Sequence, residues 1–278
     1  MENKIYSYKY PHPAVTTDCV VFGFDGCQLN ILLIERGNEP YKGCWAFPGG
    51  FMNMDETAEE GAMRELNEET GLKLTQLKQF GAFTAVNRDP RERVVTIAFY
   101  ALTKKSDVQG GDDAAKARWF PLDEMPTLAF DHDNILQKAI EQMKKDIYFE
   151  SLHRITPERI TKLDKNEIFV FGSNLEGAHG GGAAWQAYRE FGAIMGQGVG
   201  LQGQSYGIPT MHGGPKDILP YVEEFIEFAK QHPELTFLVT KIGCGIAGFM
   251  TKEIAPLFVG AVDVKNIFLP QDFWKELI

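Results

Sequence analysis

Three glutamates, Glu65, Glu68 and Glu69, stand three and four residues apart within the segment Asp55–Gly71. On a helix this spacing places all three carboxylates on one face. Like charges repel there, so the arrangement gains stability only when a cation lies beside it. Hard carboxylate oxygens suit Mg²⁺ or Mn²⁺ bound partly through water and a substrate phosphate. Such a metal polarises a phosphoryl group and acidifies an attacking water, which makes metal-dependent hydrolysis the predicted chemistry.

The acidic segment carries the signals of a helix with defined ends. Thr57 and Glu60 form a capping-box pattern, so we expect the helix to start there. Gly71 is a natural residue for the turn that ends it. Gly61 falls on the acidic face, where a small residue leaves room beside the carboxylates, although glycine costs about 1 kcal/mol inside a helix. Upstream, residues 47–50 (FPGG) predict a tight turn whose backbone can approach a metal or a phosphate.

The spacing of the whole segment resembles the Nudix box, G-x₅-E-x₇-R-E-U-x-E-E-x-G-U, where U is a bulky aliphatic residue. The flanking stretches, residues 45–50 and 119–122, are also similar to this family, and the resemblance covers about residues 10–150. Every defined position of the box is matched, by Gly50, Glu56, Arg64, Glu65, Leu66, Glu68, Glu69, Gly71 and Leu72.

The Nudix resemblance implies roles for the residues of the box. Glu65, Glu68 and Glu69 would bind Mg²⁺ with help from the Gly50 carbonyl. Arg64 would pair with Glu68 or Glu56 and hold the loop. Either Glu69 or Glu65 is expected as the general base. The family sometimes uses a glutamate outside the box as the general base. Glu92 is a candidate for it, although a role as a charged loop residue is more expected for Glu92.

The stretch Asn87–Val95 looks like that of ADP-ribose pyrophosphatases and of their non-catalytic sensor relatives. Of its three arginines, we expect Arg88 or Arg93 to bind substrate phosphates, with Arg91 as a third candidate. A solubilising role for all three is the alternative. Phe47 and Phe83 are expected to pack in the core more readily than to stack on a base.

The first half of the chain must position this helix, and its pattern predicts strands around it. Residues 15–24 and 29–34 flank Asp25-Gly26, a good hairpin signal, and residues 94–102 and 117–120 look like further strands. A helical period covers residues 134–147. We expect residues 1–150 to form an α+β domain, a Nudix-type α/β/α sandwich with a mixed sheet.

Strands and helices alternate in residues 151–278, which predicts a three-layer α/β/α domain. The expected strands are residues 168–171, 205–208, 236–240 and 266–269, and the expected helices are residues 183–191, 218–230 and 251–259. Glycine-rich loops follow two of the strands and open helices, an arrangement that suits an anion. The residues expected to bind substrate there are Asn174, Gly181, Gly182, Gly243, Gly245, Ile246 and Gly248.

The order of these loops distantly resembles a macro domain, the ADP-ribose-binding module. The resemblance implies a hydrogen bond from Asn174 to a ribose hydroxyl. One departure is Arg159, which stands where that family usually has an acidic residue for the adenine amino group, so we expect weak discrimination for adenine. Cys244 between glycines is interpreted as a loop former because no histidine base is positioned for it.

The bulk composition narrows the class of protein. Apolar residues make up 44% of the 278 residues, enough for a globular core, and the net charge of −10 argues against nucleic acid as a partner. No pair of the four cysteines is spaced as C-x-x-C, and no apolar run could span a membrane. We expect a cytoplasmic protein whose partner is a small-molecule nucleotide. The sequence is compatible with a homodimer.

Together these patterns predict an Mg²⁺- or Mn²⁺-dependent hydrolase that splits ADP-ribose into AMP and ribose 5-phosphate, with a second domain that binds an ADP-ribose-related ligand. Two alternatives stay open. One is a non-catalytic ADP-ribose sensor that controls transcription. The other is a Nudix hydrolase of another nucleoside diphosphate compound, such as a dinucleoside polyphosphate.

Overall fold

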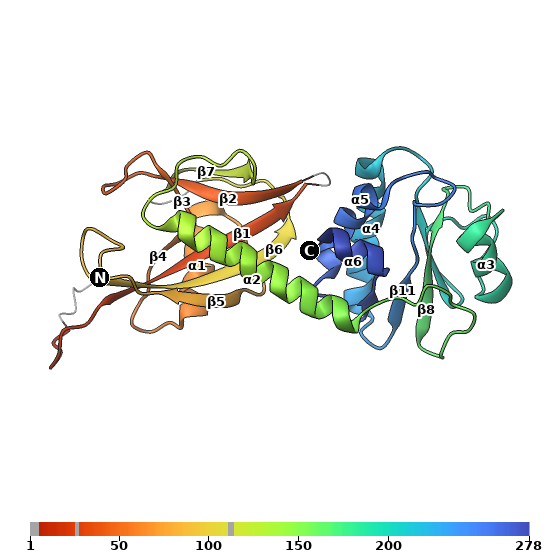
Figure 1. Ribbon diagram of the computed structural model, residues 1–278, viewed down its shortest axis with the longest axis horizontal. Helices are drawn as coiled ribbons and strands as arrows, with labels where there is room; N and C mark the ends of the chain where they lie inside the picture. Colours follow the sequence, from red (N-terminus) through yellow and green to blue (C-terminus); the bar gives the residue numbers. More distant parts are fainter. Residues whose placement is uncertain (1–5, 26–27, 111–113, 278) are drawn as a thin grey trace. The chain divides into compact units, whose positions relative to one another are not determined.

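The computed structural model describes residues 6–25, 28–110 and 114–277, and its contacts divide the chain into two compact units (Figure 1). Unit 1 comprises residues 1–23 and 29–142, and unit 2 comprises residues 24–28 and 143–278. Gly26 of the expected hairpin turn, Cys27 and residues 1–5 lie outside the described residues. Cys19, Cys44 and Cys244 are free thiols.

The first half of the chain builds one seven-stranded sheet and two helices. The sheet has the order β3-β2-β1-β6-β5, with β4 paired to β1 and β7 paired to β2. The elements are β1 (Ala14–Phe24), β2 (Leu29–Arg36), β3 (Trp45–Ala46), β4 (Gly49–Phe51), α1 (Ala58–Thr70), β5 (Lys78–Phe83), β6 (Val94–Lys104), β7 (Ala114–Pro121) and α2 (His132–His153).

Helix α1 is the predicted acidic helix, and its ends are those that the sequence indicates. Thr57 and Glu60 form both hydrogen bonds of the capping box, and Gly71 ends the helix with a φ of 72°. Ala62 and Leu66 pack against one face of the sheet in a buried cluster. The apolar face of α1 thereby fixes the direction in which its glutamates point.

The opposite face of the sheet is covered as well. Val20 and Phe22 alternate with the β1 residues that contact α1, and both are fully buried. Ile135 and Ala139, in the first half of α2, are also fully buried. Figure 1 shows α2 crossing the sheet on the side away from α1. The α/β class predicted from the sequence is confirmed.

Unit 2 has a five-stranded sheet of the order β12-β11-β8-β10-β9. The strands β12, β11, β8 and β10 run parallel, and β9 is antiparallel to β10. Its elements are β8 (Glu167–Ser173), α3 (Gly182–Glu190), β9 (Gly200–Gln202), β10 (Ser205–Pro209), α4 (Pro215–Gln231), β11 (Thr236–Val239), α5 (Thr251–Ile254), the 3₁₀ helix η1 (Ala255–Ala261), β12 (Ile267–Phe268) and α6 (Gln271–Leu277).

Helices lie on both faces of this second sheet. Phe169 and Leu238 pack on the side of α3, in a buried cluster with Ala187. Phe237 packs on the other side, edge-on to Phe225 of α4 at a centroid distance of 5.5 Å. Parallel strands covered on both faces form three layers, helix, sheet and helix.

Two expected elements differ from the structure. The helix expected over residues 251–259 is only four α-helical residues, Thr251–Ile254, followed by a 3₁₀ helix. Pro256 explains the change, because proline lacks the N–H that an α-helix needs there. Helix α2 reaches His153, so it runs through residue 150, where the expected first domain ends.

No helix in the described ranges is long and apolar enough to cross a bilayer.

Candidate active site

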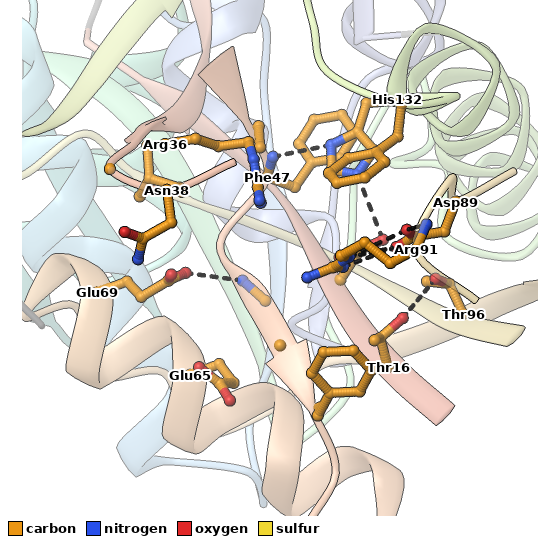
Figure 2. Close-up of a pocket in the computed structure, with 18 of the residues that line it drawn as sticks. Thr16, Arg36, Asn38, Phe47, Glu65, Glu69, Asp89, Arg91, Thr96 and His132 are labelled. Carbon is orange, nitrogen blue, oxygen red and sulfur yellow. Dashed lines mark hydrogen bonds and ion pairs between the residues drawn. The ribbon is translucent and has the colours of Figure 1, made fainter. Parts of the chain in front are cut away.

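A cavity of about 460 Å³ opens in unit 1 beside the acidic face of α1. Its wall also includes residues of β1, β2 and β4, of the loops at residues 37–39 and 88–91, and of the start of α2. Figure 2 shows the labelled side chains: Glu65 and Glu69 below, Arg36 and Asn38 on one side, and Asp89, Arg91 and His132 on the other. The expected residues that line it are Gly50, Arg64, Glu65, Glu68, Glu69 and Arg88.

Arg64 holds the acidic loop and helix together. Its guanidinium donates two hydrogen bonds to the Glu56 carboxylate, at 3.0 and 2.7 Å. It also donates to Glu65 at 2.8 Å, to Glu68 at 3.0 Å and to the carbonyl of Phe51 at 3.2 Å. This arrangement includes both pairings that the sequence offers for Arg64. The guanidinium lowers the pKa of Glu56 to about 2.

Two positions near the carboxylates require glycine, because carboxylate oxygens occupy the space that a side chain would need. A Cβ on Gly50 would lie 2.4 Å from Oε1 of Glu65. A Cβ on Gly61 would lie 2.9 Å from Oε1 of Glu56. The room predicted beside the carboxylates is therefore filled by carboxylate oxygens.

Glu69 is the most enclosed of the three helix carboxylates. Its side chain accepts a hydrogen bond from the Gly49 N–H at 2.9 Å, and the residue is 7% exposed. Burial raises the pKa of Glu69 to about 8, and it also raises the pKa of Glu65. A neighbouring cation would lower both pKa values and restore the charged carboxylates.

No three histidine, cysteine or acidic side chains converge on one point in the part of the chain that the structure describes. Arg64 draws Glu65 and Glu68 toward itself, while Glu69 bonds to Gly49. Glu69 nevertheless forms no ion pair with any described residue, although it is buried. Buried carboxylates without a compensating cation fit a hard divalent metal ion.

The cavity wall holds a second buried carboxylate, on Asp18 of β1. Burial raises the pKa of Asp18 to about 7. Its nearest charged or polar partners are loose: Nη2 of Arg88 at 4.0 Å and Nε2 of His132 at 3.7 Å. The Asp18 carboxylate makes no hydrogen bond to any described residue.

His132, at the start of α2, is fixed as a neutral imidazole. Its Nδ1 accepts a hydrogen bond from the N–H of Phe47 at 3.1 Å, so the proton lies on Nε2. The Phe47 ring stacks on the imidazole at a centroid distance of 4.9 Å. Burial lowers the pKa of His132 to about 3. Phe47 is 1% exposed and packs in the core, the role expected for it.

The three expected arginines occupy different surroundings. Arg88 is buried and forms a bidentate pair with Asp131, at 2.6 and 3.1 Å, and it donates to Thr96. Arg91 lines the cavity and pairs with the buried Asp89 at 2.7 Å. Arg93 donates to the carbonyls of Thr84, Ala85 and Val94.

Neither Arg93 nor Glu92 is among the described residues that line the cavity. A fourth arginine, Arg36 at the end of β2, does line it and is half-buried. Its Nε donates to the carbonyl of Pro40 at 2.9 Å, and its guanidinium lies 4.8 Å from the centre of the Phe130 ring. Arg91 approaches the rings of Phe51 and Phe130, at 5.3 and 5.7 Å.

Sequence reasoning did not single out Asp18, Arg36, Phe51, Phe130 and His132. Asp18 is the one charged residue of β1, and this single charge inside a buried strand was the one available signal. The other four lie at element ends or in loops, where only the folded chain brings them together.

Unit 2 has its own cavity, of about 310 Å³, between the two glycine-rich loops. The expected residues that line it are Asn174, Gly181, Gly182, Gly243, Gly245 and Ile246, whereas Gly248 is not among its described lining residues. The Asn174 amide bonds within its own loop, donating to the Ala178 carbonyl and accepting from the Ala178 N–H.

A second hollow of about 580 Å³ shares Ala183, Thr240 and Lys241 with this cavity and includes Arg159. Cys244 is half-buried and burial raises the pKa of its thiol, which disfavours the nucleophilic thiolate. This agrees with its interpretation as a loop former.

Comparison with known proteins identifies the family of unit 1 and several of its relatives. The NUDIX domain model matches residues 12–142. The chain is 42% identical over 128 residues to an ADP-ribose pyrophosphatase of Methanocaldococcus jannaschii, covering 46% of the chain and 73% of that protein. It is 34% identical over 175 residues to the ADPR responsive transcriptional repressor NtrR of Acinetobacter baylyi, covering 60% of the chain and 70% of that protein.

Among solved structures, the chain is similar to the NUDIX domain of Shewanella oneidensis NrtR complexed with ADP ribose. The identity is 31%, the match covers 49% of this chain and 93% of that one, and the TM-score is 0.47. The sequence relatives, the matched domain and the complete acidic motif on α1 agree with one another. The chain therefore belongs to the Nudix family, and its residues 12–142 form the domain of a Nudix pyrophosphohydrolase.

Proposed function

We propose that unit 1 hydrolyses the pyrophosphate bond of ADP-ribose and releases AMP and ribose 5-phosphate. The observation that carries this proposal is the 42% identity to a protein named ADP-ribose pyrophosphatase, over 73% of its length. The cavity beside α1 supports it, because the acidic residues of α1 and the guanidinium groups of Arg36 and Arg91 line the same cavity. A divalent metal and a polyanionic substrate need these two environments.

In this proposal Glu65, Glu68, Glu69 and the Gly50 carbonyl hold Mg²⁺ or Mn²⁺. When bound, the metal supplies Lewis-acid stabilisation of the phosphoryl oxygens. Glu69 or Glu65 accepts the proton of the attacking water. The water oxygen bonds to one phosphorus, the bridging oxygen leaves with the other phosphate, and Arg64 keeps the carboxylates in place.

The test is release of AMP from ADP-ribose by the full chain, with Mg²⁺ and with an excess of chelator. Glu69→Gln should lower turnover by about a hundredfold or more, because it removes a negatively charged metal ligand while the side chain keeps almost the same shape. Glu59→Gln is the matched control, since Glu59 is an exposed glutamate of the same helix. Hydrolysis that survives both the chelator and Glu69→Gln would refute the metal mechanism.

A panel of substrates separates this activity from that of other Nudix hydrolases. ADP-ribose should be preferred to nucleoside triphosphates and dinucleoside polyphosphates in kcat/KM. A triphosphate or a dinucleoside polyphosphate that is preferred by about tenfold, a difference of 1.4 kcal/mol, would replace ADP-ribose as the proposed substrate.

A second candidate function is a sensor that reads ADP-ribose and controls transcription. The identity of 34% to a repressor described as ADPR responsive favours the sensor function. The same identity argues against the expectation that nucleic acid is not a partner. The net charge of −10 weighs on the other side. Retention of duplex DNA by the full chain, lost on addition of ADP-ribose, would favour the sensor. Turnover without DNA binding would favour the hydrolase.

For unit 2 we propose binding of an ADP-ribose-related ligand, as the distant resemblance of residues 151–278 to a macro domain implies. Glycine loops that follow parallel strands and line a cavity support it, because their N–H groups suit a phosphate. Asn174 is engaged within its loop, so its proposed bond to a ribose hydroxyl requires exchange of partners. Arg159 lies in the adjoining hollow, and its side chain has no acceptor for an adenine amino group.

A further inference from the structure

Two side chains of opposite charge, Arg36 and Asp18, line the cavity of unit 1 without pairing with each other. Arg36 and Asp18 both line it, and each shifts the pKa of the other through its charge. They form no ion pair with each other, and the charged or polar neighbours of the Asp18 carboxylate among the described residues are Arg88 and His132, at 4.0 and 3.7 Å. Opposite charges held apart in a partly buried site are costly unless something lies between them.

The Arg36 guanidinium is held in place by two contacts that leave its donors free. Nε donates to the Pro40 carbonyl at 2.9 Å, and the plane lies over the Phe130 ring at 4.8 Å. The two terminal nitrogens have no partner in the described part of the chain. A guanidinium fixed this way presents a fork of N–H groups that matches a phosphate.

The Asp18 carboxylate is enclosed by its surroundings, and it offers acceptors. It is 7% exposed, it lies on a central strand, and Oδ1 would be only 2.6 Å from a Cβ on Gly49. Its distances to Arg88 and His132, 4.0 and 3.7 Å, are too long for strong hydrogen bonds. A buried carboxylate with free lone pairs is suited to accept hydrogen bonds from hydroxyl groups.

We infer that Arg36 and Asp18 together bind one ribose phosphate moiety of the substrate, Arg36 through the phosphate oxygens and Asp18 through the ribose hydroxyls. This inference rests on the proposed hydrolysis of ADP-ribose and names the part of the ligand that these two residues recognise. It gives Asp18 a role in specificity, separate from the metal-binding carboxylates of α1. Substrates without a free ribose hydroxyl next to a phosphate are discriminated against here.

The test is calorimetry on the full chain with two matched pairs of ligands, ribose 5-phosphate against 2-deoxyribose 5-phosphate and AMP against 2′-deoxy-AMP. For at least one pair, the ribo compound should bind about tenfold more tightly than the deoxy compound. Asp18→Asn should reduce that preference to about twofold or less, because a carboxylate is a stronger acceptor than an amide. Arg36→Gln should weaken both members of the same pair by about tenfold and leave their ratio unchanged.

Matched controls are available on exposed positions. Arg118→Gln removes another arginine that lies over a phenylalanine, at 5.0 Å from the Phe120 ring, on the strand paired with β2. Asp123→Asn removes an exposed carboxylate. Neither control should alter any dissociation constant. Binding in unit 2 is common to all variants, so differences between variants report on Arg36 and Asp18 alone.

Three results would overturn the inference: no ribo preference in the wild-type protein, a preference that survives Asp18→Asn, or effects of the two variants on different ligand pairs. Far-ultraviolet circular dichroism and thermal melts establish that each variant is folded. Failure of the proposed function is a different result, because the wild-type protein would then fail to release AMP from ADP-ribose. A protein that hydrolyses ADP-ribose with unaltered ribo preference in Asp18→Asn refutes this inference alone.

Discussion

Replacing Arg64 by lysine should loosen the acidic loop while keeping its charge. Arg64 makes five hydrogen bonds, four to carboxylate oxygens and one to the Phe51 carbonyl. A lysine ammonium has three donors, so at least two bonds are lost. Bonds to charged groups contribute about 1.5–3 kcal/mol each, and the side chain is 27% exposed, so we expect unfolding to become easier by about 2–3 kcal/mol.

The rate of hydrolysis should fall by more than the loss of stability alone would suggest. Glu65 and Glu68 both lose a fixed donor, and a displacement of about 1 Å in a catalytic group costs about a hundredfold in rate. The assays are urea denaturation at fixed temperature and AMP release from ADP-ribose. Arg118→Lys, on an exposed arginine of β7, is the control and should change neither quantity.

The pH dependence gives this prediction its sharpest check. Arg64 holds the pKa of Glu56 at about 2 in the folded protein, below its ordinary value. A depressed carboxyl pKa contributes stability that is present above the unfolded pKa and is lost as the pH falls through the folded pKa. A second variant, Arg64→Met, removes the charge that Arg64→Lys keeps. The difference in the free energy of unfolding between the wild type and Arg64→Met should therefore narrow from about pH 5 downward. A gap that stays constant, or an Arg64→Lys enzyme with normal stability and rate, would refute the reasoning.

Three further predictions concern other parts of the chain. Gly245→Val should weaken binding of ADP-ribose to unit 2 without loss of folding, because a Cβ there meets no atom within 4 Å; unchanged calorimetry would argue for a structural loop. Arg154→Met should lower the free energy of unfolding by about 3–5 kcal/mol, since its buried guanidinium bonds to four backbone carbonyls and to Glu150; a loss under about 1 kcal/mol in urea denaturation would contradict this. Gly50→Ala should reduce turnover by about tenfold or more, because its Cβ would displace the Glu65 carboxylate; normal kcat would show that Glu65 can move freely.

The acidic helix was predictable because its information is local. The capping box, the glutamate spacing and the terminal glycine all lie within the seventeen residues of Asp55–Gly71. Strand β5 was not predicted, since its sequence KQFGAF alternates poorly and contains a glycine. Strand β5 forms because its backbone pairs with that of β6, and its own residues do not indicate a strand.

The far side of the cavity could not be derived in the same way. Arg36, Asp18 and His132 are separated in sequence and meet only through the sheet and the start of α2. Among the arginines of residues 88–93, the fold decides which guanidinium is buried, which lines the cavity and which bonds to backbone carbonyls. Sequence spacing in a loop carries no such information, because loop side chains have no fixed period.

The hydrogen bond from the Phe47 amide to His132 provides a spectroscopic reporter within the cavity. It locks the imidazole as a single neutral tautomer with the proton on Nε2, and a pKa of about 3 keeps it so throughout the neutral range. Its two ring nitrogens should give separate ¹⁵N resonances whose positions do not change with pH in that range. Because Nε2 faces Asp18 at 3.7 Å, that resonance should shift when a ligand bonds to the carboxylate, and a titration by nuclear magnetic resonance could follow occupancy without turnover.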